Sequence, residues 1–212
     1  HVLMECSNNS LTITATDLEV QLSSTISDID SSDEFITTIP GRKAFEIIRS
    51  LGNTQIELAV SDTSVVIKSS NSSFKLQTLA ANEFPLFDAA GSDNSFGAKQ
   101  KEIKSLFTKT QFSMAQQDVR FYLNGLLLEA SPNTLVSVGT DGHRLSKSKI
   151  SIEKAKINET SYILPRKAVQ EVQRIISDQG ETKITFSDNR AIFEIGPTTL
   201  VTKLIDGSFP DY

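Results

Sequence analysis

The sequence predicts an α+β fold with antiparallel sheets, built from two copies of one domain. Short stretches of alternating apolar and polar residues, typical of strands with one buried face, recur along the 212-residue chain. Only three segments carry apolar residues at helical spacing, and each stands alone between runs of strands. This order excludes a doubly wound fold, in which strands and helices alternate regularly.

Four short motifs recur at an offset of about 124 residues, which indicates an internal duplication. The duplication predicts two domains, residues 1–92 and 93–212. Residues 93–124 have no counterpart before residue 1, so we expect the first copy to lack about 30 residues at its start. A chain that begins with His1 rather than Met fits that expectation. The paired motifs are Thr16-Asp17 with Thr140-Asp141, Arg42-Lys43-Ala44 with Arg166-Lys167-Ala168, Ser61-Asp62 with Ser187-Asp188, and Phe84-Pro85 with Phe209-Pro210.

The first copy is expected to hold one helix between two groups of strands. Apolar residues at helical spacing predict a helix over 41–51, with Pro40 before it and Gly52 after it, as helix boundaries prefer. A polar turn at 61–64 predicts that the strands on either side form a hairpin. The predicted strands are 11–15, 18–22, 56–60, 65–68 and 74–79.

The second copy repeats this order and adds a helix at its start. Ile103, Leu106 and Phe107 predict a helix near 98–110. A second helix is predicted near 165–176 and ends before Gly180. The predicted strands are 120–130, 135–140, 145–150, 184–187, 191–195 and 199–205.

Composition excludes several classes of protein. No apolar run approaches the roughly 20 residues that span a bilayer, and the start lacks a secretory signal. Cys6 is the only cysteine, so no intramolecular disulfide is expected. With two His and two Met, a metal site or a haem cofactor is not expected either.

The charge is distributed unevenly. The chain carries 21 Lys and Arg against 26 Asp and Glu, and a net charge of −5 ordinarily argues against nucleic acid. The three helical segments, however, hold ten Lys or Arg and three Glu, a net of about +7 that leaves about −12 elsewhere. Helix surfaces favour Lys and Arg paired with Glu, which is the simpler explanation, but Glu is scarce here. The alternative explanation is that the molecule has a basic face formed by the helices and an acidic face formed by the sheets.

The chain shows no catalytic constellation. Asp141, His143 and Arg144 cluster in one place, where an acid/base pair is conceivable. Asp-Gly at the end of an alternating strand is more simply a turn signal. Phosphate-binding, dinucleotide-binding, nucleophile-elbow and spaced Cys/His motifs are absent from the sequence, so we expect a binding protein.

Longer motifs carry a specific resemblance. They are IPGRKAFEIIR (39–49), TQFSMAQQDVRFYLNG (110–125), TDGHRL (140–145), LPRKAVQEV (164–172) and LIDGSFPDY (204–212). Together they resemble the bacterial DNA polymerase III beta subunit, the replicative sliding clamp, over essentially the whole chain.

The resemblance implies a fold and a function. Family members contain three copies of one domain, and two protomers join head to tail in a ring with basic helices inside and acidic sheets outside. This chain would then hold most of domain one and all of domain two. The clamp encircles double-stranded DNA and tethers the polymerase in the cytoplasm, without cofactor or catalysis of its own. The nucleotidyltransferase activity under which it is catalogued belongs to the holoenzyme.

The resemblance also implies three sets of site residues. Polymerase, clamp loader and repair proteins dock short hydrophobic peptides in a cleft that matches Leu123, Thr140, Gly142, His143, Arg144, Leu145 and Pro210. The DNA contacts match Arg42, Gln117, Phe121, Tyr122, Arg166 and Lys167. The dimer interface matches Lys43, Phe74 and Leu76 on or near an edge strand.

Some of these assignments leave alternatives open. Phe121 stands where relatives commonly carry Tyr, and a strand residue packed in the core is an equal alternative for it. Asn71 and Ser73 stand where family members can carry Arg, which predicts a weakened or rearranged ionic interface. Without domain three we expect no ring closure by this chain. The competing functions are a protein-only scaffold, whose basic helices bind acidic partners, and a hydrolase centred on Asp141 and His143.

Overall fold

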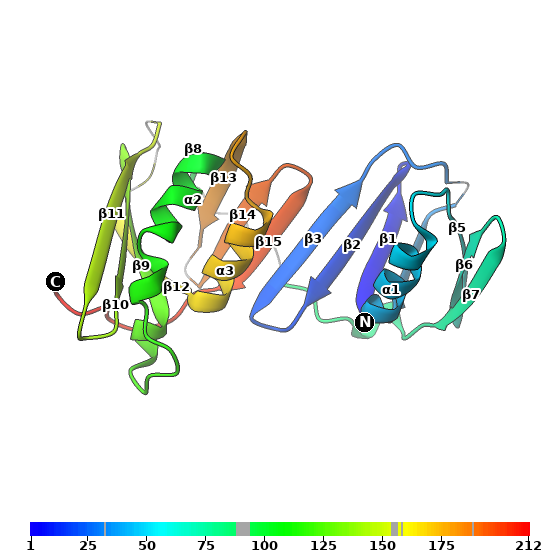
Figure 1. Ribbon diagram of the computed structural model, residues 1–212, viewed down its shortest axis with the longest axis horizontal. Coiled ribbons are helices and arrows are strands. Elements are labelled where there is room, and N and C mark those ends of the chain that lie inside the picture. Colours follow the sequence, from blue (N-terminus) through cyan, green and yellow to red (C-terminus); the bar gives the residue numbers. More distant parts are fainter. Residues whose placement is uncertain (32, 88–93, 154–156, 158, 188) are drawn as a thin grey trace. The chain divides into compact units, whose positions relative to one another are not determined.

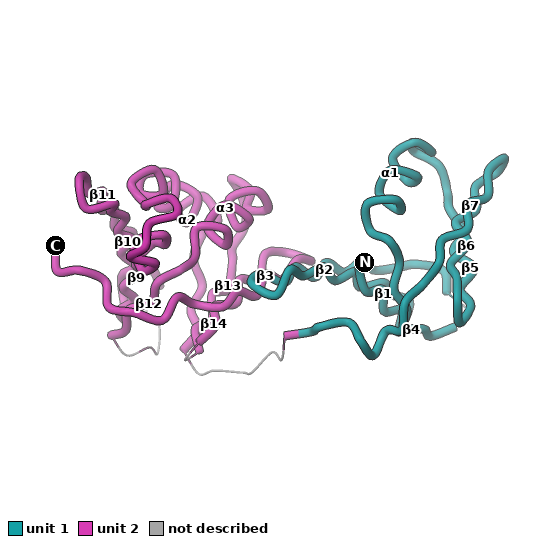
Figure 2. Tube along the Cα trace, turned by 90° about the horizontal axis from the view of Figure 1, so that it is seen from below, with its two compact units in different colours: residues 1–86 teal, residues 87–212 magenta. Residues whose placement is uncertain are grey.

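The computed structural model describes residues 1–212 except 32, 88–93, 154–156, 158 and 188. The chain divides into two compact units, His1–Leu86 and Phe87–Tyr212 (Figure 2). The predicted domain boundary between residues 92 and 93 lies outside the described residues and stays a prediction.

The described residues of unit 1 form two antiparallel groups of strands and one α-helix (Figure 1). Within it, the larger group of strands has the order β4-β1-β2-β3 and the smaller has the order β5-β6-β7. The elements are β1 (Val2–Ser7), β2 (Ser10–Thr16), β3 (Val20–Ile26), β4 (Phe35–Ile39), α1 (Gly41–Leu51), β5 (Glu57–Ser61), β6 (Ser64–Ser69), β7 (Ser72–Gln77) and the 3-10 turn η1 (Ala81–Glu83).

The part of unit 2 that the structure describes forms two antiparallel groups of four strands and two α-helices. Their orders are β11-β10-β9-β12 and β15-β14-β13-β8. Helix α2 packs against β8 in one group and against β10 and β11 in the other. The elements are β8 (Ser95–Lys99), α2 (Gln100–Thr108), η2 (Gln111–Ser113), η3 (Phe121–Asn124), β9 (Gly125–Ser131), β10 (Thr134–Thr140), β11 (Leu145–Ser151), β12 (Thr160–Pro165), α3 (Arg166–Ile175), β13 (Glu181–Phe186), β14 (Arg190–Ile195) and β15 (Thr198–Lys203).

The two units share one topology, as the repeated motifs predict. The order β9-β10-β11-β12-α3-β13-β14-β15 repeats β1-β2-β3-β4-α1-β5-β6-β7, and the strands pair in the same sequence within each sheet. Each proline-to-helix motif marks the same junction, because Pro40 precedes α1 and Pro165 ends β12 before α3. The first strand and helix of unit 2, β8 and α2, have no counterpart among the described residues of unit 1.

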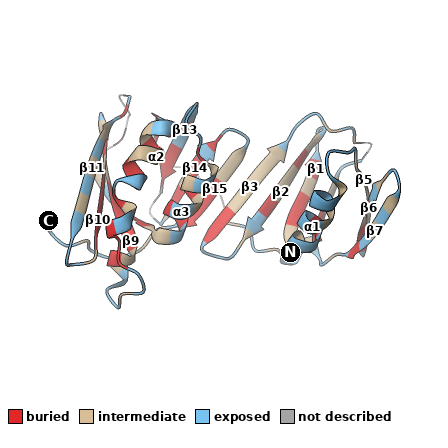
Figure 3. Ribbon diagram, viewed as in Figure 1, coloured by how far each residue is buried: buried red, intermediate tan, exposed pale blue. Residues whose placement is uncertain are grey.

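That difference explains how the helices are buried. In α3, Val169 and Val172 are fully buried, and α3 packs against α2. The equivalent side chains of α1 are Phe45 and Ile48, which are 62% and 41% exposed. Figure 3 accordingly shows exposed and intermediate residues along most of α1. The apolar face of α1 is open because nothing among the described residues occupies the place of α2.

The core of unit 2 is built around aromatic side chains. Phe107 of α2 and Phe193 of β14 are both fully buried, and their rings meet edge to face at 6.5 Å. Tyr162 stacks on Phe186 at 4.3 Å between ring centroids, which adds to the stabilisation from their burial. These contacts tie α2, β12, β13 and β14 into one scaffold.

The α+β class, the antiparallel pairing and the three helices are confirmed, with several corrections. The strand predicted over 120–130 is wrong at its start, since residues 121–124 form the 3-10 turn η3 and the strand begins at Gly125. Leu18 lies in a turn rather than in a strand. Lys99 and Lys109 flank α2 instead of lying within it. Strands β1, β4, β8 and β12 were not predicted. No helix in the described part of the chain has the length and hydropathy needed to cross a bilayer.

Candidate functional site

The segment from Thr140 to Leu145 forms a tightly hydrogen-bonded turn between β10 and β11. The Thr140 hydroxyl donates to the carbonyl of Arg144 at 2.7 Å and accepts from the amide of Gly142 at 3.1 Å. The Asp141 carboxylate accepts from the amides of His143 and Arg144, each at 3.0 Å. One Thr and one Asp therefore bond the amides of residues 142–144 and the carbonyl of Arg144.

Unit 1 contains the same turn between β2 and β3. The Thr16 hydroxyl donates to the carbonyl of Val20 at 3.0 Å and accepts from the amide of Leu18 at 3.1 Å. Asp17 accepts from the amides of Glu19 and Val20 at 3.0 and 2.9 Å. The recurring Thr-Asp pair therefore stabilises the same turn in both copies of the domain. It does so in unit 1 as well, where Glu19 stands at the position of His143.

This geometry argues against acid/base chemistry at Asp141. Its pKa lies below the ordinary value, chiefly because the amide of His143 donates to the carboxylate, with further donation from the Arg144 backbone and guanidinium. A carboxylate engaged in this way favours the charged form and supports the turn. The predicted turn therefore explains the cluster.

The third position of the turn has a left-handed backbone in both units. Gly142 has a φ of 87° and Leu18 has a φ of 76°. A non-glycine residue pays a steric cost there, which glycine avoids. We expect Leu18→Gly to stabilise unit 1 by about 0.5–1 kcal/mol, because relief of this strain exceeds the entropy lost by glycine. Hydrogen exchange resolved by unit measures the change.

Gly142→Leu is the matched control. It introduces the same strain into unit 2, and a Cβ at this position lies 3.1 Å from the Arg120 guanidinium. Slower exchange in unit 1 for Leu18→Gly should accompany faster exchange in unit 2 for Gly142→Leu. Equal protection of unit 1 with Leu or Gly at position 18 would show that this backbone stores no strain.

A second, rigid loop lies against the turn. The amide of Asp118 donates to the Asn124 side-chain oxygen at 3.0 Å, and the Asn124 amide group donates back to the carbonyl of Asp118 at 2.9 Å. Arg120 forms a bidentate pair with the Asp118 carboxylate at 3.0 and 2.8 Å. The same guanidinium donates to the carbonyl of Asp141 at 3.3 Å. Arg120, which the sequence did not single out, thus connects the loop to the turn.

The Asp118–Arg120 pair makes a pH-dependent contribution to the loop. Hydrogen bonds from the Arg120 side chain and backbone lower the pKa of Asp118 from 3.8 to about 2. Because the folded-state pKa is depressed, the contribution is present above pH 3.8 and is lost as the pH falls through about 2. Carboxyl NMR titration should give a value near 2, and Arg120→Ala should return it towards 3.8. A wild-type titration at the ordinary value would contradict this account.

The structure brings most of the predicted cleft residues to one end of unit 2. Thr140, Gly142, His143 and Arg144 belong to the turn, and Leu145 follows it at the start of β11, 46% exposed. The turn is braced by Arg144, which donates to the carbonyl of Phe112 at 2.7 Å.

Two cleft residues contribute differently. Leu123 is only 1% exposed, so it supports the surface from beneath. Pro210 is exposed and lies in the segment after β15. Pro210 lines a cavity of about 670 Å³ together with Phe209, Tyr212 and Lys147. Of these four residues, only Pro210 was predicted. Lys147 is two residues beyond Leu145 on β11, so the cavity adjoins the turn through this strand.

The predicted DNA contacts fall on two kinds of element. Arg42 opens α1 with a side chain that is 92% exposed and pairs with Glu46 at 3.2 Å. Arg166 and Lys167 open α3; Arg166 is half-buried and donates to the carbonyl of Met114 at 3.4 Å, and Lys167 is exposed.

The loop contacts differ from the helix contacts. Phe121 is 56% exposed, so the alternative that it packs in the core is wrong. Its ring meets that of Tyr122 at 5.8 Å, and both pack against Gly207. Gln117 is exposed with a φ of 57°, and Val119, which was not predicted, is 95% exposed.

The predicted dimer edge lies on β7, which is an edge strand of its sheet. Phe74 is half-buried there, and Asn71 and Ser73 are exposed. Leu76 is 6% exposed and packs in the core of unit 1, so it has little surface to offer a partner. Lys43 lies on α1 and is exposed. The apolar part of this predicted interface therefore rests on Phe74.

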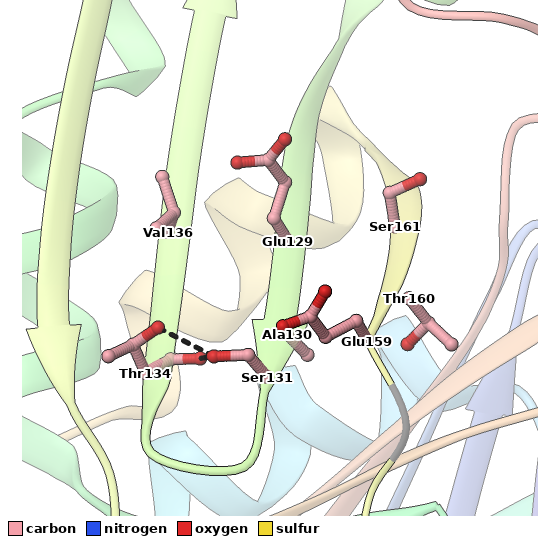
Figure 4. Close-up of a pocket in the computed structure, with 8 residues that line it drawn as sticks. All are labelled: Glu129, Ala130, Ser131, Thr134, Val136, Glu159, Thr160 and Ser161. Atoms are coloured by element: carbon pink, nitrogen blue, oxygen red, sulfur yellow. Dashed lines mark hydrogen bonds between the residues drawn. The ribbon is translucent and has the colours of Figure 1, made fainter.

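Another cavity, of about 410 Å³, opens over the β9–β10 hairpin and β12 (Figure 4). The Ser131 and Thr134 hydroxyls in it lie 2.7 Å apart, and its charged lining residues are Glu129 and Glu159. None of the predicted site residues lines it. No group of three or more His, Cys, Asp or Glu able to hold a metal occurs among the described residues.

Comparison with known families matches both units. A family model described as the DNA polymerase III beta subunit, N-terminal domain, matches residues 1–88. A second, described as the central domain of the same subunit, matches residues 98–211.

Individual proteins are similar over the whole chain. The beta sliding clamp of Pseudomonas aeruginosa is 37% identical over 214 residues, covering 100% of this chain and 58% of the relative. That of Escherichia coli K12 is 36% identical over 215 residues with the same coverage. The chain thus spans 58% of the length of these curated relatives.

Solved structures are similar as well. The DNA polymerase III subunit beta from Pseudomonas aeruginosa superposes with a TM-score of 0.96 at 38% identity, covering 100% of this chain and 58% of that one. The Helicobacter pylori beta clamp bound to a DNA ligase peptide superposes with a TM-score of 0.90 at 31% identity, covering 100% and 60%. These similarities confirm the predicted duplicated clamp fold.

Proposed function

This chain belongs to the DNA polymerase III beta subunit family, and from that premise we propose that it forms two of the domains of a sliding clamp. In the full-length protein, two protomers would close into a ring around double-stranded DNA. The ring would tether the replicative polymerase to DNA and so make synthesis processive. The protein would act in the cytoplasm. The clamp performs no catalysis; nucleotide transfer is carried out by the polymerase that it holds.

One observation carries this proposal: each of the two repeat-related helices carries an Arg-Lys pair in its first turn, shortly after a proline. Arg42 and Lys43 open α1, and Arg166 and Lys167 open α3. Duplication has therefore placed cations at the same point of each unit; Arg42, Lys43 and Lys167 are exposed and Arg166 is half-buried. Repeated cations suit a duplex, whose phosphates recur along its axis, and neutralising phosphates gives attraction without sequence preference.

A ring that slides requires weak contacts. Retention comes from enclosure, so individual Lys–phosphate contacts need supply little free energy. Once tethered, a polymerase that dissociates rebinds before diffusing away, because its effective concentration stays high. The absence of a phosphate-binding loop from this sequence fits a clamp that is opened by a separate loader.

We place the docking of partner peptides at the turn from Thr140 to Leu145. The Helicobacter pylori relative is bound to a DNA ligase peptide, which supports a peptide-binding role for this family. In this chain the turn is rigid, Leu145 is half-exposed beside it, and Pro210 lines the adjoining cavity. Polymerase, clamp loader and repair proteins would use this surface in turn.

Product length tests this function. The full-length protein, with its loader, ATP and cognate polymerase on a primed circular template, should lengthen the product of each polymerase binding event. Unchanged product length would contradict the proposal. A protein-only scaffold, the second candidate, predicts binding to acidic partner proteins and no lengthening.

A further inference from the structure

A pocket in unit 1 and the cavity beside β11 in unit 2 share one lining motif, the Phe-Pro pair that follows the last strand. In both units a Phe-Pro pair lies in the segment after the last strand: Phe84-Pro85 in unit 1 and Phe209-Pro210 in unit 2. In unit 2 this pair lines the cavity of about 670 Å³. In unit 1 it lines one of about 280 Å³, just below the roughly 300 Å³ at which the range of small-molecule pockets begins. The lining residues are His1, Thr16, Thr38, Leu79, Ala80, Glu83, Phe84 and Pro85.

The hydrogen-bonded turn adjoins this pocket too. Thr16, the first residue of the turn in unit 1, is one of the lining residues. Its hydroxyl is engaged by Val20 and Leu18, just as that of Thr140 is engaged in unit 2. The pocket therefore has one wall that the fold holds rigid.

A second part of the lining is also fixed in place. The buried Thr38 hydroxyl donates to the carbonyl of Leu79 at 3.0 Å and accepts from its amide at 2.9 Å. The Leu79 backbone is thereby clamped to β4, while its side chain remains 58% exposed. An exposed leucine on a fixed backbone is preorganised for an apolar contact, because little entropy is lost on binding.

The charge around this pocket differs from that of unit 2. The turn in unit 1 carries Asp17 and Glu19, and Glu83 stands exposed on the rim. The turn in unit 2 carries His143 and Arg144 at the positions of Glu19 and Val20. The lining of the unit 1 pocket contains no Lys or Arg. Glu83 on the rim and the acidic turn therefore favour a ligand that carries positive charge.

We propose that the pocket of Thr16, Leu79, Glu83, Phe84 and Pro85 is a second peptide-docking site, which takes a short segment with an apolar side chain flanked by Lys or Arg. Leu79, Phe84 and Pro85 contact the apolar side chain, and Glu83 attracts the flanking cation. The inference rests on the proposed function in one respect, the docking of peptides at the related turn of unit 2. It adds a site with a different peptide preference.

Fluorescence anisotropy with two synthetic peptides tests this site on the full-length protein. Labelled KKLFK should bind, and labelled DDLFD should bind about tenfold more weakly. Glu83→Lys and Leu79→Ser should each weaken KKLFK binding by about tenfold. Both side chains are exposed, so both variants are expected to fold.

Two controls separate this site from other surfaces. Leu86→Ser changes a similarly exposed leucine of the same segment that does not line the pocket, and Leu145→Ala changes the unit 2 surface. Both should leave KKLFK affinity within about twofold. Equal affinity for the two peptides, or loss of KKLFK binding in Leu145→Ala, would overturn the proposal. A protein that extends processivity yet does not bind KKLFK would refute this site alone.

Discussion

Reversing Arg42, Arg166 and Lys167 to Glu is expected to weaken binding of the full-length protein to duplex DNA by about 100-fold at low salt. Each reversal removes one cation near a phosphate and adds a repelling anion. The slope of log affinity against log salt should also fall, by about 0.9 for each phosphate contact that is lost. Equilibrium titrations at several salt concentrations measure both effects.

A triple reversal on the strands is the matched control. Lys68, Lys149 and Lys183 lie on β6, β11 and β13, and their reversal changes the net charge by the same amount. It should alter affinity by only a few-fold, through long-range charge that salt screens. Because Arg166 also bonds the carbonyl of Met114, the Arg42/Lys167 double variant provides a check on folding. Equal losses in the helix and strand variants would contradict a basic helical lining.

Leu145→Ala is expected to weaken binding of a polymerase-derived hydrophobic peptide by about 10- to 100-fold. Burying one leucine against a partner contributes about 1.5–3 kcal/mol, and Ala forfeits most of that contact. Leu145 is 46% exposed at the start of β11, so the change should cost little stability. Isothermal titration of the full-length protein with the peptide gives the change in affinity.

DNA binding provides the counter-measurement for this variant. Leu145 is uncharged and lies on β11 rather than on α1 or α3, so duplex affinity should stay within about twofold. Leu86→Ala, a change at a similarly exposed leucine of unit 1, should leave affinity for the polymerase peptide unchanged. An unaltered peptide affinity in Leu145→Ala would show that the cleft lies elsewhere.

The duplication was predictable because its signals are local. The Thr-Asp pair recurs since the turn after the second strand needs a hydroxyl and a carboxylate at those two positions in each unit. The prolines before α1 and α3 recur because a helix tolerates proline only at its start. Such requirements remain visible in the sequence after the rest of the two copies has diverged.

The missed strands lack a clean alternation. In β4, buried Thr37 and Thr38 occupy positions where an apolar residue is the usual signal. In β1, the neighbours Leu3 and Met4 are both buried, so the strand is covered on both faces and does not alternate. Tertiary packing, rather than local pattern, decides these elements.

The predicted start of β9 was wrong for a related reason. Residues 121–128 are nearly all apolar and resemble one long strand. The reciprocal Asp118–Asn124 bonds and the Asp118–Arg120 pair instead hold 121–124 in a 3-10 turn and keep Phe121 exposed. These partners face one another only in the folded loop, which the spacing of apolar residues does not encode.

Retention on DNA of defined topology tests the central claim most directly. The full-length protein, loaded with its loader and ATP, should remain on circular duplex DNA and leave after the circle is cut once. Gel filtration before and after linearisation separates these outcomes. Persistence on the linear product, or equal loss from both templates, would contradict a sliding clamp.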